Sequence, residues 1–296
     1  MPPSYVGRFA PSPTGPLHFG SLVAAAGSYL EARCRSGRWL LRVEDVDRPR
    51  TVTGAEATIL RQLEALGFEW DAEPWRQSAR DEHYVAALAR LRAASQVFDC
   101  GCSRREIADS ALAPDGAPRY PGTCRDGLRP GRRARTVRLK TEAGLAVCFD
   151  DGVQGRICED VGAEVGDFVL KRADGLFAYQ LAVVVDDAHQ GITHVVRGED
   201  LADNTARQVV LQHALGLLTP VYLHTPLVLA ADGHKLSKQN GAAPLDLADP
   251  VGALQAAGLV LGLPAIEADT PARWLAQAVP AWAGIIRAPS TRSDSP

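Results

Sequence analysis

The chain has 296 residues, of which 46% are hydrophobic and 23% are charged, and its formal net charge is −3. This composition is typical of a soluble protein with two or three domains, and it excludes one that coats nucleic acid through overall positive charge. No apolar run reaches the roughly 18 residues that cross a membrane, so we expect a cytoplasmic protein without membrane association. The apolar residues 22–30 lie between prolines and charged residues, which favours an amphipathic helix over a secretion signal.

Residues 5–33 predict a strand, a stiff loop and a helix. A short apolar strand at 5–10 leads into a loop rich in proline and glycine, and an alanine-rich helix follows from about Gly20 to Arg33. Proline fixes φ, so this loop should keep one shape. A helix N-terminus that follows a strand binds phosphate well, and His18 stands where it could donate a hydrogen bond to one. An ordinary loop with a solvated histidine is the alternative.

The next segments extend this pattern. Residues 39–43 predict a buried strand, and carboxylates and arginines, Glu44 among them, crowd the seven residues after it. The carboxyl ends of parallel strands share one edge of a sheet, so we expect this cluster beside the first loop, where a carboxylate can hold a substrate ammonium group. A solvated charged turn is the alternative interpretation of these residues. Helices predicted at 53–67 and 83–97 make the fold class α/β with an open parallel sheet.

The amino-acid composition changes between residues 96 and 176, which predicts a module inserted into the first fold. Short strands are predicted there at 136–139, 145–149 and 167–171. Seven cations stand in the 16 residues from Arg125 to Lys140. Such a stretch can face the phosphates of a nucleic acid, and a solvated loop is the alternative.

Three cysteines of this module, Cys100, Cys102 and Cys124, lie within 25 residues. Three thiolates and one further ligand can bind Zn²⁺ tetrahedrally, although Cys-x-Cys is closer than the usual spacing. Free structural thiols are the alternative. The spacing leaves the fourth ligand open among Tyr120, Cys148, Cys158 and water.

The α/β pattern returns after residue 177. Strands are predicted at 181–185, 192–196, 221–224 and 227–229, and helices at 208–215, 251–261 and 272–278, before a polar tail at 290–296 that we expect to be disordered. Arg197 follows the second of these strands, where its planar fork could clamp a carboxylate. A loop with glycine at both ends carries Lys235 and Lys238, whose point charges suit a polyphosphate.

Five short motifs, which follow one another along the chain in the family's order, resemble those of class I aminoacyl-tRNA synthetases of the glutamyl type. Pro-Leu-His18-Phe-Gly20-Ser matches the HIGH signature of that family, and Lys235-Leu-Ser-Lys238-Gln matches its KMSKS signature. The three glutamyl-type motifs are Arg8-Phe-Ala-Pro-Ser12, Arg42-Val-Glu44-Asp45-Val-Asp47 and Arg197-Gly-Glu-Asp200. The resemblance implies a Rossmann-like, doubly wound parallel sheet. Its expected parts are two catalytic halves at 1–95 and 177–241, an inserted zinc-binding and RNA-contacting α+β module at 96–176, and a short helical segment at 242–289.

Full glutamyl-tRNA synthetases carry a further helical half that grips the tRNA anticodon, and this chain stops soon after the KMSKS-like loop. With Cys-x-Cys and Tyr-x-x-x-Cys in the insertion, it is similar to the glutamyl-queuosine tRNA(Asp) synthetases. That resemblance implies a monomer that activates L-glutamate with ATP and Mg²⁺ without needing tRNA, then transfers it to queuosine in the tRNA(Asp) anticodon. It also implies one structural Zn²⁺ bound by Cys100, Cys102, Tyr120 and Cys124.

The same resemblance implies roles for individual residues. Those expected to bind glutamate are Arg8, Ala10, Ser12, Glu44, Tyr179 and Arg197. Those expected to bind ATP are Pro11, His18, Gly20, Ser21, Lys235, Leu236, Ser237 and Lys238. Among these, His18, Lys235 and Lys238 are expected to be catalytic because they would face phosphates on which charge develops. Two rival functions are a truncated glutamyl-tRNA synthetase that charges tRNA(Glu) and a non-catalytic synthetase-like protein that binds RNA.

Overall fold

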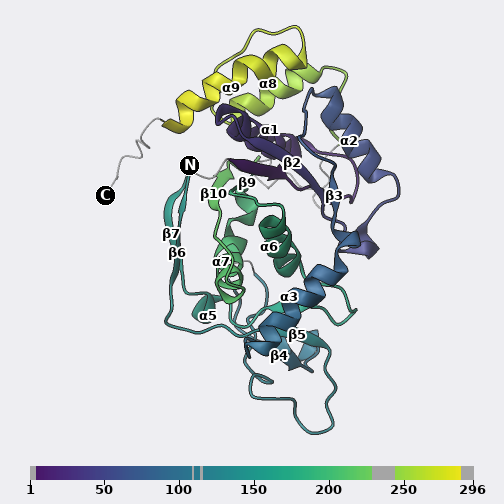
Figure 1. Ribbon diagram of the computed structural model, residues 1–296, viewed down its shortest axis with the longest axis vertical. Coiled ribbons are helices and arrows are strands. Elements are labelled where there is room, and N and C mark those ends of the chain that lie inside the picture. The colour runs from purple at the N-terminus through teal and green to yellow at the C-terminus, as the bar shows by residue number, and fades with distance from the viewer. Residues whose placement is uncertain (1–4, 109, 114–115, 229–243, 288–296) are drawn as a thin grey trace.

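The computed structural model describes residues 5–108, 110–113, 116–228 and 244–287, and a parallel sheet from the N-terminal part lies beneath its first helix (Figure 1). Helix α1 (Phe19–Cys34) connects the first two strands of this sheet. The strands are, in spatial order, β1 (Val6–Phe9), β2 (Arg38–Val43) and β3 (Trp75–Arg76). The strands predicted at 5–10 and 39–43 are confirmed.

A second sheet continues the first across a short seam. The backbone N–H of Thr193 donates to the carbonyl oxygen of Val6 over 2.9 Å, and the N–H of Val6 donates to Thr193 Oγ1 over 2.9 Å. The strands of the second sheet, outward from the seam, are β9 (His194–Gly198), β10 (Val221–Thr225), β6 (Val147–Asp151) and β7 (Gly155–Glu159), with β7 antiparallel to β6. Together the two sheets have the strand order of a doubly wound α/β fold, and that order reverses between β1 and β9.

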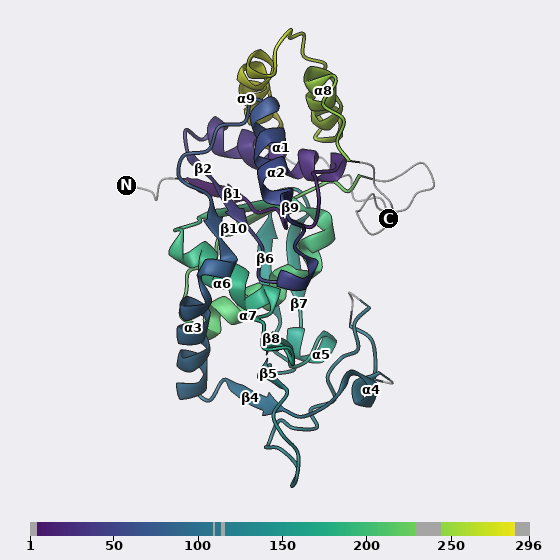
Figure 2. The same ribbon diagram turned by 90° about the vertical axis from the view of Figure 1, so that its right-hand side faces the viewer.

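Both faces of this combined sheet are buried. Leu40 and Val195 belong to one hydrophobic core, whereas the next residue along each strand, Leu41 and Val196, belongs to the other. Helices α1, α8 (Pro250–Val260) and α9 (Pro271–Arg287) cover the second core, and Figure 2 shows α8 and α9 at one end of the molecule. Burial on both faces explains why these strands are almost continuously apolar.

The strand predicted at 181–185 is wrong, because these residues lie in helix α6 (Tyr179–His189). Residues 180–187 are all buried in this helix, which packs against the sheet and against helices α3 and α7. A helix that is apolar on all sides gives the same continuous run as a buried strand, so the pattern alone could not distinguish them.

The other predicted helices are confirmed, with shifted ends: α2 (Ala55–Ala65), α3 (Asp81–Ala93), α7 (Thr205–Ala214), α8 and α9. Helix α9 continues nine residues beyond its predicted end at 278. Three short 3₁₀ helices are η1 (Arg48–Arg50), η2 (Gln77–Ala79) and η3 (Glu199–Asn204). Residues 227 and 228 are not in a strand. Residues 235–238 and the tail at 290–296 lie outside the described residues. None of the described helices is long and apolar enough to cross a bilayer.

The range predicted as an insertion divides between two sheets. One part forms a separate antiparallel sheet with two short helices: β4 (Val97–Cys100), β5 (Thr136–Leu139), β8 (Val169–Lys171), α4 (Arg104–Ile107) and α5 (Val161–Glu164). The other part, β6 and β7, joins the central sheet, where Asp151 pairs with Tyr222 of β10. A disulfide links Cys148 and Cys158 across these two strands. The domain boundaries stay a prediction, and residues 147–159 belong to the central sheet.

Candidate active site

A cleft of about 570 Å³ opens at the carboxyl ends of β1, β2 and β9, where the strand order reverses. Open α/β sheets bind ligands at this position. All the described residues to which the resemblance gave a glutamate or ATP role line it: Arg8, Ala10, Pro11, Ser12, His18, Gly20, Ser21, Glu44, Tyr179 and Arg197. Lys235, Leu236, Ser237 and Lys238 lie outside the described residues. The structure therefore brings together side chains that are up to 189 positions apart in the sequence.

The first loop is held in place by backbone hydrogen bonds from the segment after β2. The N–H of Glu44 donates to the carbonyl of Pro11 over 3.0 Å, and the N–H of Val52 donates to that of Pro13 over 2.9 Å. His18 is the N-cap of α1, and its Nδ1 accepts from the N–H of Ser21 over 3.3 Å. The loop thus presents the helix N-terminus and His18 to the cleft with little freedom to move.

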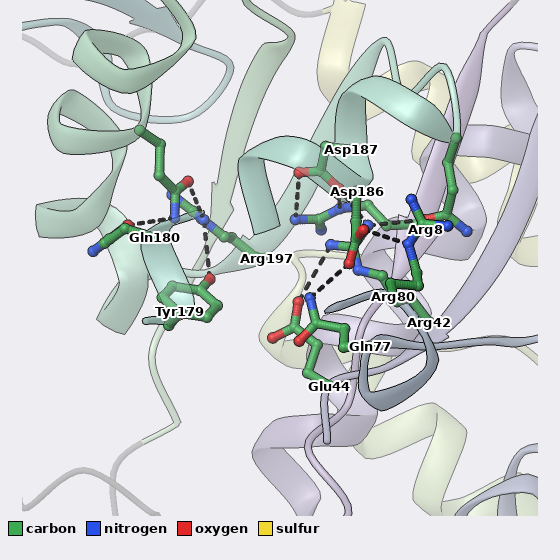
Figure 3. A network of polar contacts seen from close by, with 12 residues as sticks. Arg8, Arg42, Glu44, Gln77, Arg80, Tyr179, Gln180, Asp186, Asp187 and Arg197 are labelled. Atoms are coloured by element: carbon green, nitrogen blue, oxygen red, sulfur yellow. Dashed lines mark hydrogen bonds and ion pairs between the residues drawn. The ribbon is translucent and has the colours of Figure 1, made fainter. Parts of the chain in front are cut away.

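A network of charges lies under one wall of the cleft (Figure 3). Asp187, on α6, accepts from Arg8 Nε over 3.1 Å and from Arg42 Nη1 over 2.6 Å. Burial would raise the pKa of Asp187, but Arg42 and Arg8 outweigh it and hold that pKa below its usual value. Arg42 also pairs with Glu44, so two arginines and two carboxylates balance one another in this network, and Arg8 lines the cleft, where it can contact an anionic group of a ligand.

Glu44 supplies the opposite charge. One carboxylate oxygen accepts from Arg42 Nη2 over 3.2 Å, and its side chain is 10% exposed. Burial raises the pKa of Glu44, although Arg42 and Arg8 oppose this. A ligand ammonium group beside Glu44 would restore a counter-charge and favour the ionised carboxylate.

Arg197 enters the cleft from the end of β9 and is 5% exposed. Its Nη1 donates to Gln208 Oε1 over 2.8 Å and, more loosely, to Tyr179 Oη over 3.4 Å. Its Nη2 donates to Thr205 Oγ1 over 2.7 Å, and its Nε to His224 Nε2 over 3.2 Å. The surrounding acceptors are all neutral, so the charge of the guanidinium is available to an anionic ligand.

The sequence indicated no role for five polar residues that lie behind Arg8 and Arg197: Asp151, Asp187, Thr205, Gln208 and His224. Reading 181–185 as a strand hid the position of Asp187, which α6 turns toward Arg8 and Arg42. One available signal was Gly191, which follows the run with a φ of +68°, as a glycine after a helix C-terminus often does. The positions of Asp151 and His224 depend on the pairing of β6 with β10, which no local motif indicates.

The three predicted zinc-binding cysteines come together at the end of β4, with their Sγ atoms within 4.8 Å of one another. The Sγ atoms of Cys102 and Cys124 are 3.7 Å apart, close to the roughly 3.8 Å edge of a tetrahedron with Zn–S bonds of about 2.3 Å. Tyr120 Oη lies 3.3 Å from Cys100 Sγ and 3.8 Å from Cys102 Sγ. The four side chains therefore fit a tetrahedral Zn²⁺, whereas Cys148 is paired with Cys158.

The cluster favours a thiolate at Cys100, whereas burial and the neighbouring Cys124 and Cys100 raise the pKa of Cys102 to about 11. Burial would raise the pKa of Cys100, but the contact with the Tyr120 hydroxyl and the nearby Arg138 lower it to about 7. The guanidinium of Arg138 stacks over the Tyr120 ring, 4.0 Å from its centroid. A low thiol pKa is a property that metal-binding cysteines share, because the thiolate is the ligand.

The six arginines in the basic stretch from Arg125 to Lys140 divide into two groups. Three arginines have partners within the module: Arg125 pairs with Asp167, Arg132 pairs with Glu106, and Arg138 stacks on Tyr120. Three others have exposed side chains and no ion pair among the described residues: Arg129, Arg133 and Arg135. The first group stabilises the module, and the second is accessible to a polyanion.

The family model described as tRNA synthetases class I (E and Q), catalytic domain, matches residues 5–251. The chain is thus a class I synthetase of the glutamyl and glutaminyl kind. It is 59% identical over 260 residues, 88% of this chain and 82% of the relative, to the glutamyl-Q tRNA(Asp) synthetase of Aromatoleum aromaticum. It is 54% identical over 293 residues, 97% of this chain and 94% of the relative, to that of Cupriavidus metallidurans. The chain therefore belongs to the glutamyl-Q tRNA(Asp) synthetase family.

Among solved structures, the glutamate-tRNA synthetase of Elizabethkingia anophelis superposes with a TM-score of 0.70 at 29% sequence identity. The match covers 80% of this chain and 53% of that protein, so the chain spans about half the length of that enzyme. The class I fold expected from the motifs is confirmed by this likeness and by the family match.

Proposed function

We propose that the chain activates L-glutamate with ATP and then transfers the glutamyl group to queuosine in the anticodon of tRNA(Asp). The observation that carries this proposal is the convergence of Arg8, Glu44, Tyr179 and Arg197 in one cleft, beside the His18-capped end of α1. The cleft thus offers both signs of charge for an amino acid and a helix N-terminus for a phosphate. The names of the similar proteins supply the acceptor.

Glutamate has one ammonium and two carboxylate groups, and the cleft has a counterpart for each. Glu44 would receive the ammonium group, and Arg8 and Arg197 would receive carboxylates, with Ala10, Ser12 and Tyr179 completing the wall. An arginine selects glutamate over glutamine because the glutamine amide cannot accept two charge-assisted hydrogen bonds. Because the contact from Arg197 Nη1 to Tyr179 Oη is long, a ligand oxygen can replace Tyr179 as the acceptor.

The first reaction is attack by a carboxylate oxygen of glutamate on the α-phosphate of ATP. The new O–P bond gives glutamyl-adenylate, and the bond to the β-phosphate oxygen breaks to release pyrophosphate. Pro11, Gly20 and Ser21 would hold ATP against the helix N-terminus, with His18 at the phosphates. Class I synthetases use ATP with Mg²⁺, which neutralises phosphate charge when bound. The match of their sequence to the KMSKS signature supports a role for Lys235 and Lys238 at the pyrophosphate.

We assign Cys100, Cys102, Tyr120 and Cys124 to one Zn²⁺, as their spacing supports. Its chemistry there would be structural, because the cluster belongs to a small core of its own with Phe98 and not to the cleft. The exposed arginines of the same module would contact the tRNA backbone.

The test is glutamate-dependent exchange of pyrophosphate into ATP, measured with purified protein and with or without tRNA. Exchange without tRNA, followed by glutamate on an anticodon fragment of tRNA(Asp) rather than at its 3′ end, is the expected result. Exchange that requires tRNA(Glu), with the label at the 3′ end, would replace this function by that of a truncated charging enzyme. No exchange in either case would favour the non-catalytic RNA-binding protein.

A further inference from the structure

A buried chain of side chains connects the turn between β6 and β7 to Arg197. His224, on β10, is 1% exposed and pairs in register with Arg197 of β9. On its other side lies Asp151, the last residue of β6. Three neighbouring strands thus place a carboxylate, an imidazole and a guanidinium in one row.

The contacts of Asp151 determine which imidazole nitrogen carries the proton. Oδ2 of Asp151 accepts from the backbone N–H of His224 over 3.0 Å and lies 2.7 Å from His224 Nδ1. Oδ1 accepts from the N–H groups of Val153 and Gln154, each over 2.9 Å. Burial would raise the pKa of Asp151, but the His224 side chain and the N–H groups of Gln154 and Val153 outweigh it and hold that pKa below its usual value, so the carboxylate only accepts. Nδ1 of His224 must therefore be the protonated nitrogen.

The opposite nitrogen then has a lone pair. Burial lowers the pKa of His224, and with Arg197 it outweighs Asp151, which raises that pKa, so the ring is neutral at pH 7. Its Nε2 accepts from Arg197 Nε–H over 3.2 Å and lies 3.2 Å from Thr205 Oγ1. Gln208, Thr205 and Tyr179 contact the Nη atoms, whereas His224 holds the Nε edge. Four of the five N–H donors of Arg197, one on Nε, two on Nη1 and one on Nη2, have these acceptors.

We propose that Asp151 and His224 are positioning residues for glutamate. Asp151 keeps the proton of His224 on Nδ1, so that Nε2 accepts from Arg197 and fixes the plane in which the guanidinium meets a carboxylate. The opposite tautomer would set two N–H donors against each other and turn Arg197 away from that plane. The proposal rests on the proposed function, because it takes glutamate as the ligand of Arg197.

The Asp151→Asn variant reverses the tautomer. Its NH₂ group would face either the two backbone N–H groups of Val153 and Gln154 or the backbone N–H and the imidazole of His224. The second placement opposes fewer fixed donors, and there the imidazole can adapt by moving its proton to Nε2. We expect the KM for glutamate in pyrophosphate exchange to rise about tenfold to a hundredfold, with the KM for ATP within about twofold of wild type. An equal change in both constants, or a fall in kcat alone, would contradict the proposal.

A pair of substitutions at His224 separates positioning from packing. In His224→Gln the amide oxygen can replace Nε2 as the acceptor for Arg197, whereas in His224→Asn the shorter amide can reach only Asp151. We expect the glutamine variant to keep a KM for glutamate within about fivefold of wild type and the asparagine variant to lose at least about tenfold. Asp151→Asn added to His224→Gln should raise the KM little further. His194→Gln, at the start of β9, is the control.

One measurement is made on the wild-type protein and does not depend on the activity of any variant. Nitrogen-15 labelling of the histidines reports the tautomer of each ring by NMR, and the His224→Gln spectrum identifies the signal. We expect a neutral ring with its proton on Nδ1, and a proton on Nε2 or a charged ring would overturn the proposal. If wild-type protein shows no glutamate-dependent exchange, the proposed function fails. If exchange is normal and neither residue affects the KM for glutamate, only the positioning role fails.

Discussion

At the scale of single residues, the cleft depends on a few buried charges whose partners come from distant parts of the chain. Arg8 and Arg42 share Asp187, while the acceptors that Arg197 has among the described residues are neutral. These two arrangements have different consequences. The positive charges of Arg8 and Arg42 are compensated inside the protein and support the fold, whereas the charge of Arg197 is left for a ligand.

Replacement of Arg197 by alanine should therefore reduce glutamate activation much more than stability. We expect kcat/KM for glutamate in pyrophosphate exchange to fall at least about tenfold, the scale of one lost charged hydrogen bond. Arg197→Lys keeps the charge without the planar fork and should lose a similar factor. Unchanged glutamate-dependent exchange in Arg197→Ala would refute the assignment of this residue to glutamate.

Asp187 should contribute stability in a pH-dependent way. Its folded-state pKa is lowered below the ordinary value of 3.8, so its contribution is complete above that pH and is lost as the pH falls toward the folded-state pKa. Asp187→Asn should destabilise the protein by about 3 kcal/mol at pH 7, and this difference from wild type should shrink below about pH 3.8. Urea unfolding at pH 7 and pH 3 measures it. Asp99→Asn, in an exposed pair with Arg92, should show little difference at either pH.

At the scale of elements, the sequence predicted most helices and strands because most have one buried side or clear ends. Helix α6 was the largest error, since its valines and leucine are buried all round and favour a strand locally. The same residues could be assigned only from their packing against α3 and α7. Motif positions such as His18, Glu44 and Arg197 were predictable, whereas Asp151 and His224 meet only through strand pairing.

The cluster at the end of β4 should depend on metal for its stability. We expect one Zn²⁺ per chain by elemental analysis of purified protein, and a lower melting temperature after removal of the metal, because a bound metal stabilises the folded state. Cys124→Ser should bind less metal and melt at a lower temperature. Cys34→Ser, at the end of α1, removes a thiol outside the cluster and should leave the metal content at that of wild type. Equal metal content in Cys124→Ser and wild type would exclude Cys124 as a ligand.

At the scale of the whole molecule, the cleft and the exposed arginines belong to different parts. The cleft lies where the two halves of the central sheet meet, whereas Arg129, Arg133 and Arg135 follow β4 in the module at the end opposite α8 and α9 (Figures 1 and 2). Amino-acid activation and RNA binding should therefore be separable by substitution.

We expect the triple change Arg129→Gln, Arg133→Gln and Arg135→Gln to weaken tRNA(Asp) binding at least about tenfold at low salt. The slope of log affinity against log salt should also become shallower, because fewer counterions are released. Pyrophosphate exchange without tRNA should stay within about twofold of wild type. Arg273→Gln, on α9 at the other end of the molecule, is the charge control. Equal tRNA affinity in triple variant and wild type would place the RNA elsewhere.

The seam between β1 and β9 also determines when the cleft can form during synthesis. Val6 and Thr193, whose hydrogen bonds join the two sheets, are 187 residues apart. At roughly 5 to 20 residues per second, a ribosome needs about 10 to 40 seconds to make the intervening chain. Through that time β1 has an open edge and Arg8 has no Asp187 to pair with. Until β9 is made, the open edge of β1 is thus a place where the newborn chain can pair with another chain and aggregate.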